Sequence, residues 1–168
     1  MNLKSLIKLF PTKPIYAHCD IPCGIYDPHQ MQMAAHTVLR MTDLIMQTKE
    51  EESEGENDDP EEREFIHKIS RLTHVKEEHG HIVEEEVGTL EVDYFKDEHF
   101  KEYPELADLL KKTAKLSVKV RQEINKELAQ ELLANTQQIA EIFWKTKSLE
   151  PVRIPSGYPT EGEIVSHK

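Results

Sequence analysis

The chain of 168 residues is long enough to bury the core of one domain, and its composition of 38% hydrophobic and 32% charged residues suits a soluble helical protein. Its formal net charge of −11 excludes a broad nucleic-acid surface, because phosphate binding requires clustered lysine and arginine. No apolar run approaches the roughly 20 residues that span a bilayer, so no membrane partner is expected either.

Residues 1–17 form a leader with three lysines and no acidic residue, unlike the rest of the chain. A secretory signal is one interpretation, but Lys8 interrupts its apolar stretch, Pro11 and Pro14 follow, and the residues before Ala17 suit signal peptidase poorly. The alternative is a leader that is removed without export, which predicts a cytoplasmic protein. Loss of the three lysines would lower the net charge from −11 to −14.

Apolar residues at helical spacing predict four amphipathic helices. Three of them are predicted to begin at or near a proline, namely Pro28, Pro60 and Pro104. Asn125 is predicted to cap the fourth, with one long helix over 104–146 as the alternative because neither Gly nor Pro marks the turn. Such helices with short connections predict an all-α, antiparallel up-down four-helix bundle over residues 28–147.

The predicted core face of the first helix consists of Met31, Ala34, Ala35, Val38, Leu39, Thr42 and Ile45. Two segments are expected to lie outside the bundle. The acidic stretch at about 50–62 repels itself and predicts a solvated loop, with cation binding as the alternative. Residues 148–168 carry three prolines and two glycines and predict a flexible C-terminal tail.

The most informative segment is HCDIPCGIYDP, residues 18–28. Cleavage between Ala17 and His18 would place a free amine, an imidazole, a backbone amide and the thiols of Cys19 and Cys23 within six residues. These donors can form fused chelate rings in a plane, which favours Ni(II) or Cu(II) over tetrahedral Zn(II). Because thiolates stabilise the oxidised metal, the donor set predicts redox catalysis rather than metal storage.

This segment resembles the nickel hook of nickel-containing superoxide dismutases, whose pattern is His-Cys-x-x-Pro-Cys-x-x-Tyr at a processed N-terminus. Two further blocks resemble the same family, one around Asp93–Leu106 and one at Ile142–Trp144. The resemblance implies a precursor with a propeptide at 1–17 and a hook at 18–27. It also implies an enzyme that converts superoxide to dioxygen and hydrogen peroxide with one nickel ion per subunit.

The resemblance also implies the ligands. His18 would supply its amine and an axial imidazole, Cys19 its amide nitrogen and thiolate, and Cys23 a second thiolate. A maturation protease that cleaves the Ala17–His18 bond is therefore an expected partner, and the family's homohexamer is the expected assembly.

The catalytic candidates carried by the resemblance are Tyr26 and Tyr94, which would line the approach of superoxide, and Asp20, which would fix the loop. Better-known members hold the hook histidine with a glutamate and an arginine, and here these positions are Ala34 and His79. Other groups, with His79 among them, would then have to orient the imidazole.

Superoxide is an anion, so basic groups are needed near the entrance of so acidic a protein. Lys96 and Lys101 are the candidates, with ordinary solvated lysines as the alternative.

Parts of the sequence are also compatible with two other functions. A ferritin-like di-iron site would use Glu64–His67 and Glu78–His81, but both motifs fall on one helix, about 21 Å apart along its axis. A metal carrier or sensor would use the same terminal chelate without tyrosines at its entrance.

Overall fold

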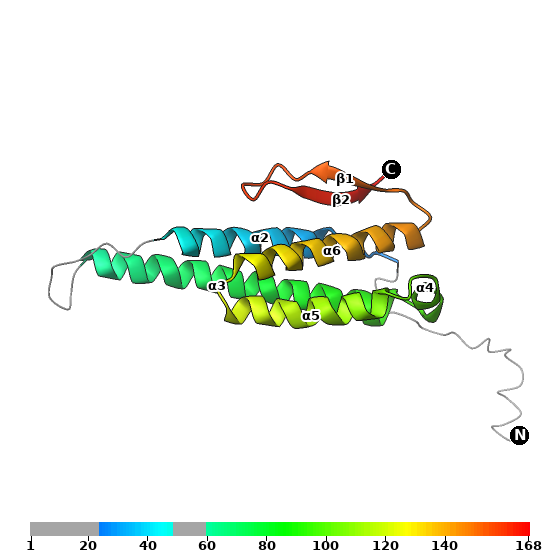
Figure 1. Cartoon of the computed structure of the whole chain (residues 1–168), viewed down its shortest axis with the longest axis horizontal. Coiled ribbons are helices and arrows are strands. Elements are labelled where there is room, and N and C mark those ends of the chain that lie inside the picture. The colour runs from blue at the N-terminus through cyan, green and yellow to red at the C-terminus, as the bar shows by residue number, and fades with distance from the viewer. Residues whose placement is uncertain (1–23, 49–59) are drawn as a thin grey trace, which may run out of the picture.

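The computed structural model describes residues 24–48 and 60–168, and four long helices dominate this part of the chain (Figure 1). Their bounds are α2 His29–Gln47, α3 Pro60–Thr89, α5 Leu106–Gln122 and α6 Lys126–Thr146. Both α2 and α5 pack against α3 and α6, so each helix borders two others around one core. The predicted four-helix bundle is confirmed. Within the described ranges, no helix combines the length and the apolar composition needed to cross a membrane.

The hydrophobic stripe predicted for the first helix faces this core. All seven of its residues are buried, namely Met31, Ala34, Ala35, Val38, Leu39, Thr42 and Ile45. Thr42 is tolerated there because its hydroxyl donates to the carbonyl of Val38, one turn earlier. The 3.6-residue period alone therefore located the buried face of α2.

The connection between α3 and α5 contains a π-helical turn, η1 Leu90–Tyr94, and a short helix, α4 Asp97–Glu102. The amide of Phe95 donates to the carbonyl of Leu90 at 2.8 Å, which closes the wider turn. Phe95 is buried, whereas Tyr94 lies at the margin of the core. The π-turn thus ends α3 and directs Tyr94 toward the end of the bundle where α2 begins.

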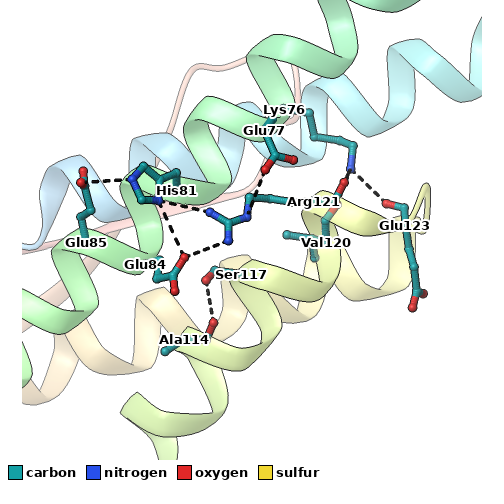
Figure 2. Close-up of polar contacts among 10 residues, drawn as sticks. All are labelled: Lys76, Glu77, His81, Glu84, Glu85, Ala114, Ser117, Val120, Arg121 and Glu123. Atoms are coloured by element: carbon teal, nitrogen blue, oxygen red, sulfur yellow. Dashed lines mark hydrogen bonds and ion pairs between the residues drawn. The ribbon is translucent and has the colours of Figure 1, made fainter.

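The turn between α5 and α6 exists although no glycine or proline marks it, so the alternative of one long helix is wrong. Asn125 accepts a hydrogen bond from the amide of Leu128 at 3.0 Å, as the capping prediction required. At the other side of the turn, the buried Lys76 reaches across from α3 (Figure 2). Its ammonium donates to the carbonyl of Val120, to that of Arg121 at 3.2 Å and to that of Glu123 at 3.0 Å. Lys76 thereby satisfies carbonyls that the end of α5 leaves without partners.

Arg121 anchors the same end of α5 to α3, as Figure 2 shows. The side chain of Arg121 crosses α3 at Gly80. A Cβ added to Gly80 would lie 2.5 Å from Cγ of Arg121. Beyond this crossing the guanidinium pairs with Glu84 at 2.9 Å and with Glu77 at 3.5 Å. Gly80 is therefore explained by close approach of a neighbouring side chain rather than by backbone conformation.

The prediction of a flexible tail over residues 148–168 is wrong, because this segment folds into two strands. The fold is therefore not entirely α-helical. Strands β1 Pro151–Pro155 and β2 Glu163–His167 form an antiparallel hairpin that lies on α2 and α6 (Figure 1). Ile164 and Val165 are buried, which explains why the segment folds despite its prolines and glycines. Turn residues were interpreted as disorder, although they mark the bend of a hairpin equally well.

Candidate metal centre

The predicted nickel ligands His18, Cys19 and Cys23, together with Asp20, lie outside the described residues. Gly24 directly follows the second of these cysteines in the sequence. Gly24 has φ +91°, a left-handed conformation that side chains other than glycine rarely adopt. The backbone therefore bends sharply where the predicted hook joins the bundle.

The two predicted tyrosines come together at this junction. Tyr26 lies in the segment before α2, and Tyr94 lies in η1, yet their ring centroids are 5.6 Å apart with an interplanar angle of 55°. The ring of Tyr94 also packs on Phe143 of α6 at 4.5 Å. Three segments far apart in the sequence thus build one aromatic wall where the end of the hook segment joins the bundle.

Hydrogen bonding fixes the hydroxyl of Tyr94. Its oxygen lies 2.7 Å from Oγ1 of Thr146, and this threonine donates its own proton to the carbonyl of Phe143. Thr146 must therefore accept, and Tyr94 is the donor. Burial raises the pKa of the Tyr94 phenol above its usual value. The phenol is neutral at physiological pH and holds its proton at a defined atom.

A lysine that the sequence analysis missed lies beside the tyrosine pair. Nζ of Lys147 is 3.5 Å from the carbonyl oxygen of Tyr26, 5.6 Å from the ring centre of Tyr94 and 4.7 Å from that of Phe143. The expected basic residues, Lys96 and Lys101, are both exposed. Lys147 follows the aromatic block at Ile142–Trp144 by one helical turn. This spacing in the sequence could have indicated a lysine beside the aromatic side chains.

An open cavity of about 810 Å³ adjoins Tyr26, between the start of α2 and the end of α3. Its wall carries three carboxylates, those of Asp27, Glu86 and Asp93. Burial and, second, the neighbouring Glu85 raise the pKa of Glu86. Asp27 accepts a hydrogen bond from the amide of His29 at 2.8 Å, which closes the turn that leads into α2.

His79, a candidate to orient the hook imidazole, is partly buried on α3. Its Nδ1 lies 2.9 Å from the carbonyl of Val75 on its own helix. A carbonyl can only accept, so Nδ1 carries a proton in this contact. Ala34, the other position that departs from the family pattern, is buried in the core and offers no polar group.

The di-iron alternative finds no geometric support. The Glu-x-x-His pairs at 64–67 and 78–81 both lie on α3, and most of their side chains are exposed. His81 instead contacts Glu85 at 3.2 Å and Arg121 at 3.2 Å. Within residues 24–48 and 60–168, no three His, Cys, Asp or Glu side chains converge as a metal site.

Comparison with known proteins decides between the remaining interpretations. The family model for nickel-containing superoxide dismutase matches residues 13–147. The chain belongs to the nickel-containing superoxide dismutase family. The matched range includes the whole hook peptide, and its donor set of one histidine and two cysteines fits nickel. The chain is therefore an oxidoreductase that acts on superoxide with nickel as its cofactor.

Individual members of the nickel superoxide dismutase family agree with this assignment. The enzyme of Streptomyces coelicolor is 36% identical over 143 residues, which cover 84% of this chain and 98% of the relative. The enzyme of Streptomyces seoulensis is 34% identical over an equal share. A solved native nickel superoxide dismutase superposes with a TM-score of 0.63 at 35% identity and covers 77% of this chain and 99% of its own. A solved nickel-containing superoxide dismutase with nickel ligation of the oxidised state superposes with a TM-score of 0.64 at 32% identity. The match covers 78% of this chain and 99% of that structure's chain.

Proposed function

We propose that this nickel superoxide dismutase acquires its site only after cleavage of the Ala17–His18 bond. In the uncut chain the nitrogen of His18 is a peptide amide, whereas cleavage makes it an amine that can donate to a metal. Cys19 and Cys23 then supply thiolates within six residues of the new terminus. The support is the donor set itself, together with the sharp bend at Gly24 and the apposed tyrosines where the hook meets the bundle.

Bound nickel supplies one-electron redox chemistry, in which one superoxide is oxidised to dioxygen and a second takes up an electron and two protons to become hydrogen peroxide. The residues of the chain govern access, charge and protons around it. Tyr26 and Tyr94 would restrict entry to a small diatomic anion, and the neutral phenol of Tyr94 would hold a proton near the substrate. Asp20 would fix the loop by hydrogen bonding.

Lys147 would supply the local positive charge that a protein of net charge −14 needs to attract an anion after cleavage. Its ammonium lies over the ring of Tyr94, whereas Lys96 and Lys101 are exposed side chains of the connector. We therefore place Lys147 before these two as the residue that draws superoxide to the tyrosine pair.

We also propose a homohexamer in the cytoplasm. Two apolar side chains near the hook junction, Ile25 at 78% and Met33 at 44%, are exposed in the single chain. A neighbouring subunit that covered this end would bury both and would also exclude water from the hook. Sedimentation equilibrium of the matured protein should give six times the mass of one chain, and a monomer that is fully active would contradict the assembly.

The deciding experiment compares the chain cut to begin at His18 with the full chain, both loaded with nickel. Superoxide consumption is expected only from the cut protein, and Cys19→Ser or Cys23→Ser should abolish it. His74→Gln is the matched control, because His74 is an exposed histidine on α3. Equal activity of the full chain, or of the Cys19→Ser variant, would show that the hook is not the site.

A further inference from the structure

The match to the family model ends at residue 147, before the C-terminal hairpin begins. The hairpin nevertheless makes specific contacts with the bundle. Figure 1 shows it lying along α2 and α6, and it contacts both helices. Its last strand is held by Gln32, the fully buried glutamine in the first turns of α2.

Gln32 pairs with the backbone of Val165 as a second strand would. Its Oε1 accepts from the amide of Val165 at 2.8 Å, and its Nε2 donates to the carbonyl of Val165 at 3.0 Å. The same Nε2 lies 3.4 Å from the carbonyl of Pro28, the residue that precedes α2. One buried side chain thus connects the hairpin to the point at which the hook peptide enters the bundle.

The hairpin is not built to receive another strand. The bonds from Ser156 to Gly162 and from Lys168 to Glu150 place the even-numbered residues of β1 in the hydrogen-bonded pairs. The backbone amides and carbonyls of the three odd-numbered residues of β1 therefore point away from β2. Two of these residues, Pro151 and Pro155, have no amide hydrogen that another strand could accept.

The outer edge of β2 is already occupied by the bundle. The carbonyl of Glu163 accepts from Gln137 of α6 at 2.7 Å and contacts His36 of α2 at 3.2 Å. With Val165 bonded to Gln32, two successive outward positions of β2 are satisfied within the chain. This arrangement favours an internal brace over a docking edge.

We propose that the hairpin is a brace for the nickel hook, with Gln32 as the positioning residue through which it acts. Holding Val165 keeps the Gln32 amide oriented toward Pro28 and so restrains the first turn of α2. Lys147, which directly follows α6, contacts the carbonyl of Tyr26, two residues before Pro28. The end of the hook, residues 24–27, would then be held in place where it joins α2. This inference rests on the proposed hook, and its test separates the two.

The test uses two glutamines that hold the same strand. Gln32→Leu removes the bonds to Val165 and Pro28. Gln137→Leu is the matched control, because it removes the bonds to Glu163 and Arg153 and leaves those to Val165 and Pro28 in place. Val165→Pro is a second variant that removes the amide donated to Gln32 from the hairpin side, and it decides the question if Gln32→Leu does not fold.

Two readouts are needed. Hydrogen exchange of the amides of residues 33–35, which bond to the first turn of α2, is measured in the nickel-free cut protein. Loss of nickel to a chelator is measured in the loaded protein. We expect Gln32→Leu and Val165→Pro to speed both by about tenfold, and Gln137→Leu to affect neither by more than about twofold.

Equal effects of the two glutamine variants on residues 33–35, or no effect of Gln32→Leu, would overturn the brace. If exchange changes as expected but the unmodified cut protein binds no nickel, the brace stands as a property of the fold and the hook assignment fails. The two inferences are therefore distinguished by the nickel-free measurement.

Discussion

The hydroxyl oxygen of Tyr94 lies 2.7 Å from that of Thr146, a bond that joins the π-helical turn to the last turn of α6. The two residues are 52 positions apart in the chain. Because Thr146 already donates to Phe143, it can only accept from Tyr94. The orientation of this phenol beside Tyr26 is thus set by a residue outside the hook.

Tyr94→Phe and Thr146→Val should each lower the free energy of unfolding by about 1 kcal/mol, because each removes the same hydrogen bond. The double variant should lose less than the sum, as expected for two residues that share one interaction. Urea denaturation of the cut, nickel-free protein measures all three. Strict additivity would show that the bond contributes nothing to stability.

Lys147→Gln should reduce kcat/KM for superoxide by about threefold at low ionic strength and weaken its dependence on salt, because a charge beside the entrance attracts the anion. Lys101→Gln is the control, because Lys101 is an exposed lysine on α4. This variant should leave the salt dependence nearly unchanged. Pulse radiolysis over a range of ionic strengths measures both. If Lys101→Gln reduced kcat/KM more than Lys147→Gln, the lysines of the connector, and not Lys147, would attract superoxide.

Lys76→Met should destabilise the bundle by about 3 kcal/mol, since it leaves the carbonyls of Val120, Arg121 and Glu123 without their donor. Lys112→Met, at an exposed ion pair with Glu131, should cost less than about 1 kcal/mol. Thermal unfolding of the two variants compares them directly. Similar melting temperatures would mean that the turn between α5 and α6 does not depend on Lys76.

His36 should make the stability of the fold depend on pH. Burial lowers the pKa of His36, although the bond to the carbonyl of Glu163 opposes this. The unfolded chain therefore takes up a proton near pH 6.5 while the folded protein does not, so stability is full above this pH and falls as the pH drops toward the folded pKa. His36→Gln should flatten this part of the profile in denaturation between pH 7.5 and 5, whereas the exposed His74→Gln should not.

Features encoded within short stretches of sequence could be predicted. The stripe of α2 and the cap at Asn125 depend on residues within a few turns of each other, and the structure has both where they were expected. The hook peptide was recognisable for the same reason, because all its donors fall within six residues. The pairing of Tyr26 with Tyr94 followed only from the family resemblance and is now seen in the geometry.

Features that depend on distant residues could not be predicted. Lys76 and the end of α5 are 44 to 47 positions apart, and Lys147 and Tyr26 are 121 apart. A buried lysine and an ordinary solvated one look alike in the sequence, since only the tertiary fold brings the carbonyls to it. The hairpin was missed because its burial against Gln32 spans 133 positions.

The hairpin also returns the chain to the end of the bundle at which α2 begins (Figure 1). A purification tag fused after Lys168 would therefore extend from the end of the bundle at which α2 begins. Under the proposed cleavage of the Ala17–His18 bond, a tag placed before Met1 would be removed together with residues 1–17. The fraction of chains that keep this tag would then measure the fraction that has not been cleaved.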